Sequence, residues 1–265
     1  KRFQKGVVAI ALIVAAGFMI LAVPLAWQTS QTPSIGLFIE PTLVVSNVRL
    51  QIKPDYVARL RVHDHLIALD AQPLENSRAL MQALAQRERG DVVTLAVQGQ
   101  AGPLRDVRVR LSSFPLKLLS VFFALPYALG LIYWGLGAWV FLTRQRESAG
   151  RVFGLMCAVI ALSLGLLFDT YTTHRFSRVW ITALSLSGSV IAHLALVFPQ
   201  RSKFLNRAPI LEYLVYAPGV IVAAINQFTI VNLEAPRAYF DTWLMAFIFA
   251  SAGGVALLVM MIYRF

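Results

Sequence analysis

Two of the four histidines flank an aspartate in the motif His63-Asp64-His65, and imidazole and carboxylate groups are ligands that suit zinc. In a strand, His63 and His65 would point the same way, while Asp64 would point to the opposite face. The other histidines, His174 and His193, lie in or beside long apolar runs and supply no third ligand near this motif. The sequence therefore predicts no metal site.

Catalytic motifs are missing from the sequence. There is no His-Glu-x-x-His of a zinc protease, and no Gly-rich phosphate loop follows an expected strand. Ser189 and His193 share one helix face, whereas intramembrane serine proteases draw these two residue types from different helices. We therefore expect neither a catalytic site nor a cofactor in these residues.

Polar side chains within apolar runs are costly in a bilayer and therefore informative. His193 lies near one end of its run, and Asp169 and His174 lie toward the opposite side of the bilayer. No carboxylate or histidine occupies the intermediate depths that a proton relay would need. We expect structural roles instead, with Asp169 contacting water or Arg175 and His193 contacting a hydroxyl group of a neighbouring helix.

The composition excludes most soluble classes of protein. Of 265 residues, 58% are hydrophobic and only 14% are charged, and the mean hydropathy is +0.66. Soluble domains carry about a quarter charged residues, so lipid must be the solvent for much of this chain. A cytosolic enzyme and a disordered regulator are excluded. A disulfide scaffold is excluded as well, because Cys157 is the only cysteine.

Six apolar runs approach the roughly 20 residues that a helix needs to cross a bilayer. They are residues 7–27, 116–142, 152–168, 179–198, 209–231 and 240–263. The first run is too long for the core of a signal peptide, and no cleavage site of small residues follows it. We therefore expect a retained anchor and a multi-pass α-helical membrane protein with about six transmembrane helices.

Basic residues in the short loops predict the orientation, because cytoplasmic loops are enriched in Lys and Arg. With the N-terminus inside, the cytoplasmic segments hold ten basic residues, and the short outer loops hold only Arg175, Arg178 and Arg237. Both ends of the chain should therefore be cytoplasmic. The expected organisation is an anchor over 1–28, an extracytoplasmic domain over 29–115 and a five-helix bundle over 116–265.

The net charge of +11 does not indicate nucleic-acid binding. The basic residues of 29–115 are nearly balanced by acidic ones, and those of the cytoplasmic segments are divided among short loops without forming a stripe. Attraction to anionic membrane lipids is sufficient to explain the inner basic residues. Membrane lipids are therefore an expected partner, and nucleic acid is not.

The outward domain has the pattern of a small mixed α/β fold. Strands are expected over 43–48, 66–70, 92–97 and 107–111, where β-branched residues are frequent or apolar and polar residues alternate. A helix is expected over 77–86, with Ser77 as its cap and with Leu80, Met81 and Leu84 on one face.

This domain resembles a PDZ domain of the bacterial, circularly permuted type. The likeness rests on His63-Asp64-His65-Leu66-Ile67-Ala68-Leu69-Asp70-Ala71-Gln72-Pro73 and on Gly90-Asp91-Val92-Val93-Thr94-Leu95-Ala96-Val97. In the first stretch, His63 and Ala71 stand where the family has glycine, so two tight turns must form without the residue that best tolerates positive φ. The resemblance also explains His63 as a substituted turn glycine.

The resemblance implies a groove that takes an extended peptide as an added strand beside a helix. Gly36-Leu37-Phe38-Ile39 would form the carboxylate-binding loop and the start of the strand, and Leu80, Met81 and Leu84 would contribute to the helical wall. These apolar side chains could equally fill the core of the domain, and for Met81 and Leu84 the sequence leaves both interpretations open. The implied partner is an extracytoplasmic peptide or protein C-terminus.

The layout of the whole chain is similar to the N-terminal sensor region of certain bacterial histidine kinases, including the competence-pheromone receptor kinases. His193 leads through an apolar stretch to Phe198-Pro199, followed by a basic loop and a helix with Pro218-Gly219. The resemblance implies the bacterial cytoplasmic membrane, a homodimer and a kinase beyond residue 265. The chain is accordingly expected to be a piece of a longer protein.

The favoured function is a sensor module that binds a peptide outside the membrane and signals to a cytoplasmic output. A domain that holds exported protein tails without signalling, as a scaffold or a protease regulator, is the alternative. A transporter is disfavoured because charged residues within the runs are scarce and no inverted repeat is visible.

Overall fold

The computed structural model describes residues 2–46, 60–99, 102–199, 205 and 208–264. In this part of the chain, six helices or helix pairs are long and apolar enough to cross a bilayer, as expected for a multi-pass membrane protein. They correspond one to one with the six apolar runs of the sequence, and most extend a few residues beyond them.

The spans differ in how continuous they are. α1 (Arg2–Gln31), α7 (Ser177–Val197) and α11 (Ala238–Arg264) are single helices. The other three spans combine α3 (Leu116–Leu119) with α4 (Leu125–Arg144), α5 (Ser148–Gly165) with α6 (Leu167–Tyr171), and α9 (Leu211–Leu214) with α10 (Ala217–Thr229). A π-helical turn at Ser120–Ala124 joins α3 to α4, just before Pro126, whose nitrogen has no hydrogen to donate.

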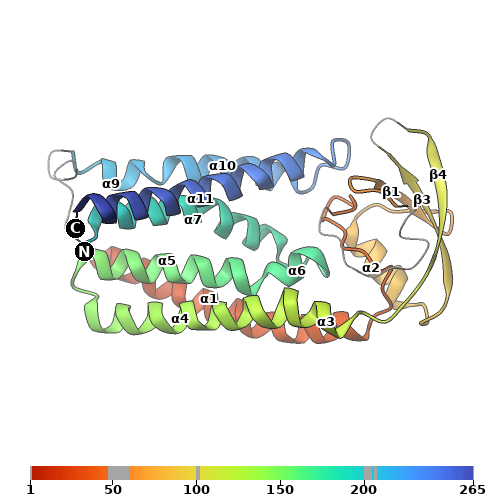
Figure 1. Cartoon of the computed structure of the whole chain (residues 1–265), viewed down its shortest axis with the longest axis horizontal. Helices are drawn as coiled ribbons and strands as arrows, with labels where there is room; N and C mark the ends of the chain where they lie inside the picture. Colours follow the sequence, from red (N-terminus) through yellow and green to blue (C-terminus); the bar gives the residue numbers. More distant parts are fainter. Residues whose placement is uncertain (1, 47–59, 100–101, 200–204, 206–207, 265) are drawn as a thin grey trace.

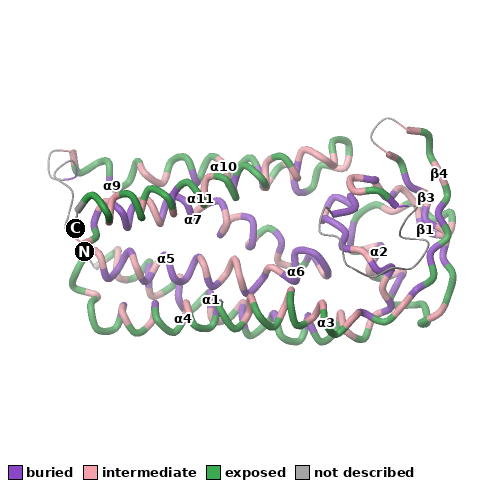
Figure 2. Tube along the Cα trace, viewed as in Figure 1, coloured by how far each residue is buried: buried purple, intermediate pink, exposed green. Residues whose placement is uncertain are grey.

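The spans form one elongated bundle with α5 and α7 at its centre (Figure 1). α5 packs against α1, α4 and α7, and α7 packs against α5, α10 and α11. Figure 2 shows the consequence of this arrangement: buried positions concentrate on α5 and α7, while few positions of α4 and α11 are buried. Both chain ends lie at one end of the bundle, the terminus end, and the α/β domain lies at the other, the domain end.

Small residues let the helix backbones approach closely. A Cβ on Gly188 of α7 would lie 2.6 Å from the carbonyl oxygen of Phe249 of α11, and a Cβ on Gly137 of α4 would lie 2.4 Å from Cys157 Cβ. Gly135 differs, since a Cβ there would meet nothing within 4 Å. Gly135 therefore takes no part in close helix packing.

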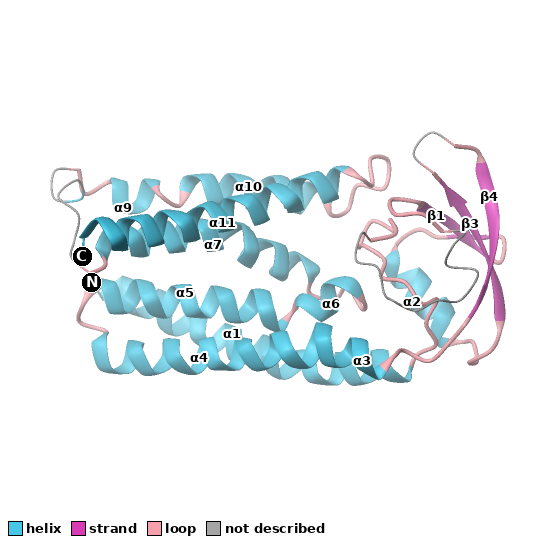
Figure 3. Cartoon of the chain, in the orientation of Figure 1, coloured by secondary structure: helices cyan, strands magenta, loops and turns pink. Residues whose placement is uncertain are grey.

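The domain between the first two spans is an antiparallel sheet with one helix against it (Figure 3). The strands are β1 (His65–Leu69), β2 (Gln72–Pro73), β3 (Val92–Gln98) and β4 (Leu104–Arg110), in the order β2-β1-β3-β4, and the helix is α2 (Ser77–Ala85). Inward residues alternate along β3 and β4. They enclose a core with residues of the preceding loop and of α2, among them Leu43, Leu66, Leu80, Leu95 and Val109.

Two local predictions for the domain are wrong. The strand expected over 43–48 is reduced to isolated bridges at Val44 and Val45, and its last two residues lie outside the described ones. Helix α2 is capped by Asn76, not Ser77. The Asn76 side-chain oxygen accepts a hydrogen bond from Ala79 N–H at 2.9 Å, while Ser77 is the first helical residue.

The turns that lack glycine keep a left-handed backbone. His63 has φ 68° and Ala71 has φ 66°, with Asp70 beside it at 46°. His63 therefore lies in a turn that precedes β1, as expected of a substituted turn glycine. Since His63 lies outside the strand, the argument that His63 and His65 point the same way from one strand does not apply.

Candidate ligand groove

A cavity of about 190 Å³ lies where the domain meets the helix bundle. We call it the junction groove. Its wall comes from five parts of the chain: the end of α1 with the residues that follow, the 37–39 segment, helix α2, Phe114, and residues 171–175 at the end of α6. The lining includes Gln28, Thr32, Leu37, Phe38, Ile39, Arg78, Met81, Leu84, Ala85, Phe114, Tyr171 and Arg175.

The segment that lines the groove has a free backbone edge at Ile39. On one side, Ser46 N–H donates to Phe38 O at 3.0 Å, and Glu40 N–H donates to Val44 O at 2.8 Å. Ile39 lies between these two bonds, so its own amide and carbonyl point to the opposite edge. Neither group has a hydrogen-bond partner among the described residues. Ile39 is 1% exposed, so an added strand can pair with these groups once the side chains that cover them move aside.

Five of the seven residues assigned to a groove from the sequence line this cavity: Leu37, Phe38, Ile39, Met81 and Leu84. Leu80 does not line it, because its side chain is fully buried in the domain core. Gly36 does not line it either. It has φ 76°, and its amide donates to Ser34 Oγ at 3.0 Å, which occupies a donor that a carboxylate-binding loop would offer.

Met81 and Leu84, which the sequence left between core and groove, serve both. Met81 is half-buried and Leu84 is buried, and both pack in or against the domain core as well as lining the cavity.

Phe38 connects the domain to the membrane helices. Its ring is 1% exposed and contacts Phe114, Phe122 and Tyr171, with ring centroids 5.1 to 6.1 Å apart. Phe168 of α6 joins this cluster through Phe114 at 5.5 Å. Aromatic pairs at such distances contribute about 0.5–1.5 kcal/mol beyond the burial of their area. The cluster fixes one wall of the groove to the helix ends.

Trp27 does not form such a contact. It is 70% exposed, and α1 continues beyond it to Gln31. The groove is reached instead by Gln28, Thr29 and Thr32.

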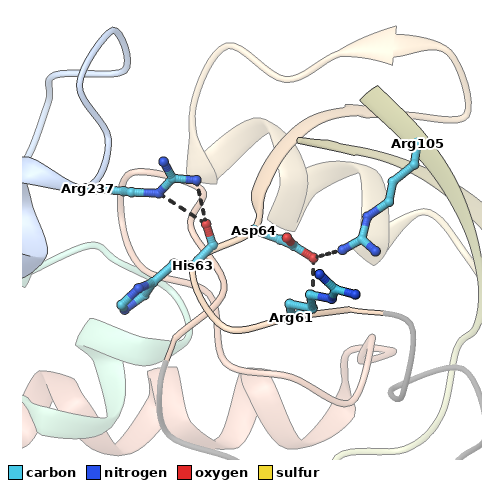
Figure 4. Close-up of polar contacts among 5 residues, drawn as sticks. All are labelled: Arg61, His63, Asp64, Arg105 and Arg237. Atoms are coloured by element: carbon cyan, nitrogen blue, oxygen red, sulfur yellow. Dashed lines mark hydrogen bonds and ion pairs between the residues drawn. The ribbon is translucent and has the colours of Figure 1, made fainter. Parts of the chain in front are cut away.

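Asp64 organises the loop that precedes β1 (Figure 4). Its carboxylate is buried, accepts a hydrogen bond from Arg61 N–H at 2.7 Å, and forms a salt bridge with Arg105 of β4. With these bonds Asp64 fixes the turn that contains His63. Within the described residues no group of three or more His, Cys, Asp and Glu side chains is placed to share a metal ion.

The same turn is attached to the start of α11, and we call this contact the domain joint. Arg237 donates to the carbonyl oxygen of His63 from Nε at 3.4 Å and from Nη2 at 3.1 Å, as Figure 4 shows. The His63 ring packs on Phe240, with centroids 4.7 Å apart, and Thr42 Oγ1 donates to Pro236 O at 2.8 Å. The domain joint ties the domain directly to the last described helix.

Glu40 is a buried carboxyl group between the junction groove and the domain joint. It is 6% exposed, and burial raises its pKa from 4.5 to about 7, an effect that a hydrogen bond from Ser46 partly offsets. Tyr171 of α6 and Tyr239 of α11 are near enough to feel its charge. Its protonation therefore changes within the neutral pH range.

His193 and Asp169, the polar residues singled out in the apolar runs, have local partners. His193 Nδ1 lies 2.8 Å from the hydroxyl of Tyr216, which confirms the expected contact with a neighbouring hydroxyl group. Asp169 accepts from the backbone amides of Phe176 at 2.8 Å and Arg175 at 3.2 Å. Asp169 therefore meets Arg175 through its main chain and stabilises the loop that leads into α7.

Sequence reasoning missed Arg237, Phe114 and Tyr171 as parts of the junction. Arg237 was counted only as a loop charge, and nothing in its neighbourhood indicates contact with a turn 174 residues earlier. The groove is therefore defined by its geometry alone. Comparison with known proteins finds no protein-family model that matches the chain and no curated protein with significant similarity to it.

Proposed function

We propose that this chain is the membrane sensor module of a bacterial signalling protein. Its PDZ-like domain, residues 29–115, faces outward and binds an extended peptide or a protein C-terminus, and its helices pass the signal to a cytoplasmic output such as a histidine kinase. The observation that carries this proposal is the junction groove, in which a free strand edge, helix α2 and the ends of α1 and α6 share one cavity.

The groove has the parts that an added strand requires. The Ile39 amide and carbonyl have no hydrogen-bond partner among the described residues. Because Ile39 is 1% exposed, an added strand must displace the side chains that cover it. Met81 and Ala85 of α2 offer an apolar wall for alternate side chains. Arg78 and Arg175 are exposed at the groove, and neither forms an ion pair with a described carboxylate. They suit the terminal carboxylate of a peptide, because charged hydrogen bonds between arginine and carboxylate are among the stronger polar contacts.

The turns at His63 and Ala71 support the PDZ-like assignment. Both residues have positive φ values and stand at positions where the family has glycine. The backbone therefore keeps the left-handed turns although the residues have changed. The relation to PDZ domains stays a proposal that rests on these turns and on the sequence of β1 and β3.

The domain joint offers a route for the signal. The groove and the joint share the stretch from Leu37 to Thr42, which packs on α6 through Phe38 and on the α10–α11 loop through Thr42. A ligand that binds one arrangement of this stretch more tightly than another would shift the ends of α6 and α11. Differential affinity of this kind is required, since a ligand that binds both states equally transmits nothing.

The test is peptide binding to the whole chain in lipid nanodiscs, with a peptide library offered as free and as amidated C-termini. Ala85→Trp fills the groove from an exposed position of α2, and Gln86→Trp, an exposed neighbour outside the groove, is the matched control. We expect binding of free C-termini that weakens about ten-fold or more on amidation and in Ala85→Trp, because one charge-assisted contact or the added strand is lost. Absence of binding, or equal binding by both tryptophan variants, would contradict the proposal.

A further inference from the structure

A second cavity, of about 490 Å³, lies beside the junction groove at the domain end of the bundle. We call it the arginine cavity. It is bounded by the start of α2, the loop before α7, the first turn of α7 and the residues that follow α10. Arg78 and Arg175 line both cavities, whereas Arg178, His174 and Ser177 line only this one.

The charge of this cavity is strongly positive. Arg78, Arg175 and Arg178 line it and are exposed, and no described carboxylate lies within ion-pair distance of any of them. Glu75 is the one carboxylate among the described lining residues. Three guanidinium groups against one carboxylate leave a net charge of +2 in the lining.

The wall of the cavity also holds buried polar groups that make no hydrogen bond of good geometry with the described residues. His174 is 7% exposed and Ser177 is 2% exposed. Neither ring nitrogen of His174 and not the hydroxyl of Ser177 makes a hydrogen bond of good geometry within the described chain. Buried polar atoms are normally paired, so two unpaired side chains at the lining of one cavity indicate a missing partner.

The backbone adds a third contribution. Ser177 and Arg178 open α7, a helix of 21 residues whose Phe176 N-cap makes no side-chain hydrogen bond to its first turn. The amides of Arg175 and Phe176 already donate to Asp169, and those of Val179 and Trp180 donate to Phe176 O. The amides of Ser177 and Arg178 have no partner among the described residues, and the partial positive charge at this helix end favours an anion. Burial lowers the pKa of His174 to about 4, partly offset by the backbone of Thr170. The ring is therefore neutral at neutral pH, and its single N–H can donate to the Thr170 backbone or to a ligand.

We propose that the arginine cavity binds a phosphate-type oxyanion at the N-terminus of α7. Arg175 and Arg178 would pair with its charge, Ser177 and His174 would donate to its oxygens, and Arg78 would close the cavity from α2. Ile230, Val231 and Leu233 form an apolar side of the same cavity at the end of α10. Apolar groups beside the arginines suit the hydrocarbon part of an anionic lipid whose phosphodiester meets the arginines, and inorganic phosphate shares the chemistry of the charged part.

The experiment uses the whole chain in nanodiscs and separates the two sources of phosphate. In phosphatidylcholine discs, inorganic phosphate is titrated at constant ionic strength against chloride, with protection of the α7 amides from hydrogen exchange as the readout. In a second arm, discs with and without phosphatidylglycerol are compared, and native mass spectrometry counts the retained anionic lipid. Protection in the first arm identifies a free anion as ligand, and retention in the second alone identifies a lipid.

The variants are Ser177→Ala combined with Arg178→Gln, neither of which lines the junction groove. Arg108→Gln on β4 is the matched control, because Arg108 is exposed and lines neither cavity. We expect the double variant to lose about ten-fold or more in phosphate affinity or lipid retention while keeping its melting temperature without anion, because a charged pair and a hydroxyl donor are removed. No binding in either arm, or equal binding by the double variant and Arg108→Gln, would overturn the proposal whether or not the groove binds peptides.

Discussion

Glu40 shows how a single buried group makes the junction sensitive to its surroundings. The carboxyl group is enclosed by the domain and by the ends of two membrane helices, and its raised pKa of about 7 results mainly from loss of water. Between pH 4.5 and about 7 the folded protein holds a proton that the unfolded chain has released. The free energy of unfolding must therefore fall as pH rises through this window.

The Glu40→Gln variant should remove this dependence. We expect it to match the wild type near pH 4.5 and to exceed its stability by roughly 3 kcal/mol above pH 8, because each pKa unit corresponds to about 1.4 kcal/mol. His174, with its lowered pKa of about 4, gives an opposite slope between pH 4 and 6.5, but it is present in both proteins and cancels in the difference. Melting curves of the two proteins from pH 4.5 to 8.5 provide the measurement, and a constant difference would refute the burial argument.

At the residue scale, the sequence predicted a contact where a buried polar side chain must have a hydrogen-bond partner. A histidine within an apolar span needs a polar partner, and the hydroxyl group of Tyr216 provides it for His193. The roles of Thr42 and Arg237 could not be predicted, because each depends on a surface that exists only after the domain docks on the bundle.

At the scale of elements, the crossing of α7 and α11 depends on Gly188. Its Cα faces the backbone of Phe249, and Gly253 of α11 approaches Gly188 in turn, with a Cβ there only 2.7 Å from Gly188 O. Gly188→Ala should destabilise the bundle by about 1–3 kcal/mol, because the helices must move apart. Gly135→Ala is the matched control, since its methyl group meets nothing and alanine is favoured over glycine in helices by about 1 kcal/mol. Thermal unfolding in detergent compares them, and equal melting temperatures would contradict this packing.

The domain joint is a second contact between elements that a substitution can isolate. Arg237→Gln removes the charged donors to His63 O and should weaken docking by about 1 kcal/mol, as expected for a partly exposed hydrogen-bonded pair. Hydrogen exchange should then quicken at the turn around His63 and at the start of α11, but not in β3. Arg108→Gln on β4 should leave all three regions unchanged. Faster exchange throughout the domain would show that Arg237 supports the fold of the domain instead of its docking.

The elements themselves were largely predictable because their signals are local. Apolar runs of sufficient length gave all six spans, and alternation gave β3 and β4. The expected strand at 43–48 failed for a physical reason. Leu43 takes a positive φ of 62° and Glu40 N–H bonds back to Val44 O, so this stretch folds into a tight turn despite its β-branched residues.

The arrangement of the whole molecule could not be read from the sequence. The groove joins Gln28, Met81 and Arg175, which are far apart along the chain and carry no pattern that relates them. Only the topology could be anticipated, since an even number of spans places both chain ends at one end of the bundle and the domain at the other. The proposed function rests on that arrangement, with the groove located where a ligand can reach the domain and the helix ends together.

The central claim is that occupancy of the junction groove alters the helices, and hydrogen exchange on the whole chain in nanodiscs tests it most directly. The probe is the tightest-binding peptide of the library with a free C-terminus, compared with its amidated form and with the Ala85→Trp variant. We expect the free peptide to change exchange at residues 37–42, at 171–175 and at the first turn of α11, and the two comparisons to show no change. A peptide that binds and protects only the groove, with α11 unaffected, would contradict a sensor and indicate a domain that holds its ligand without signalling.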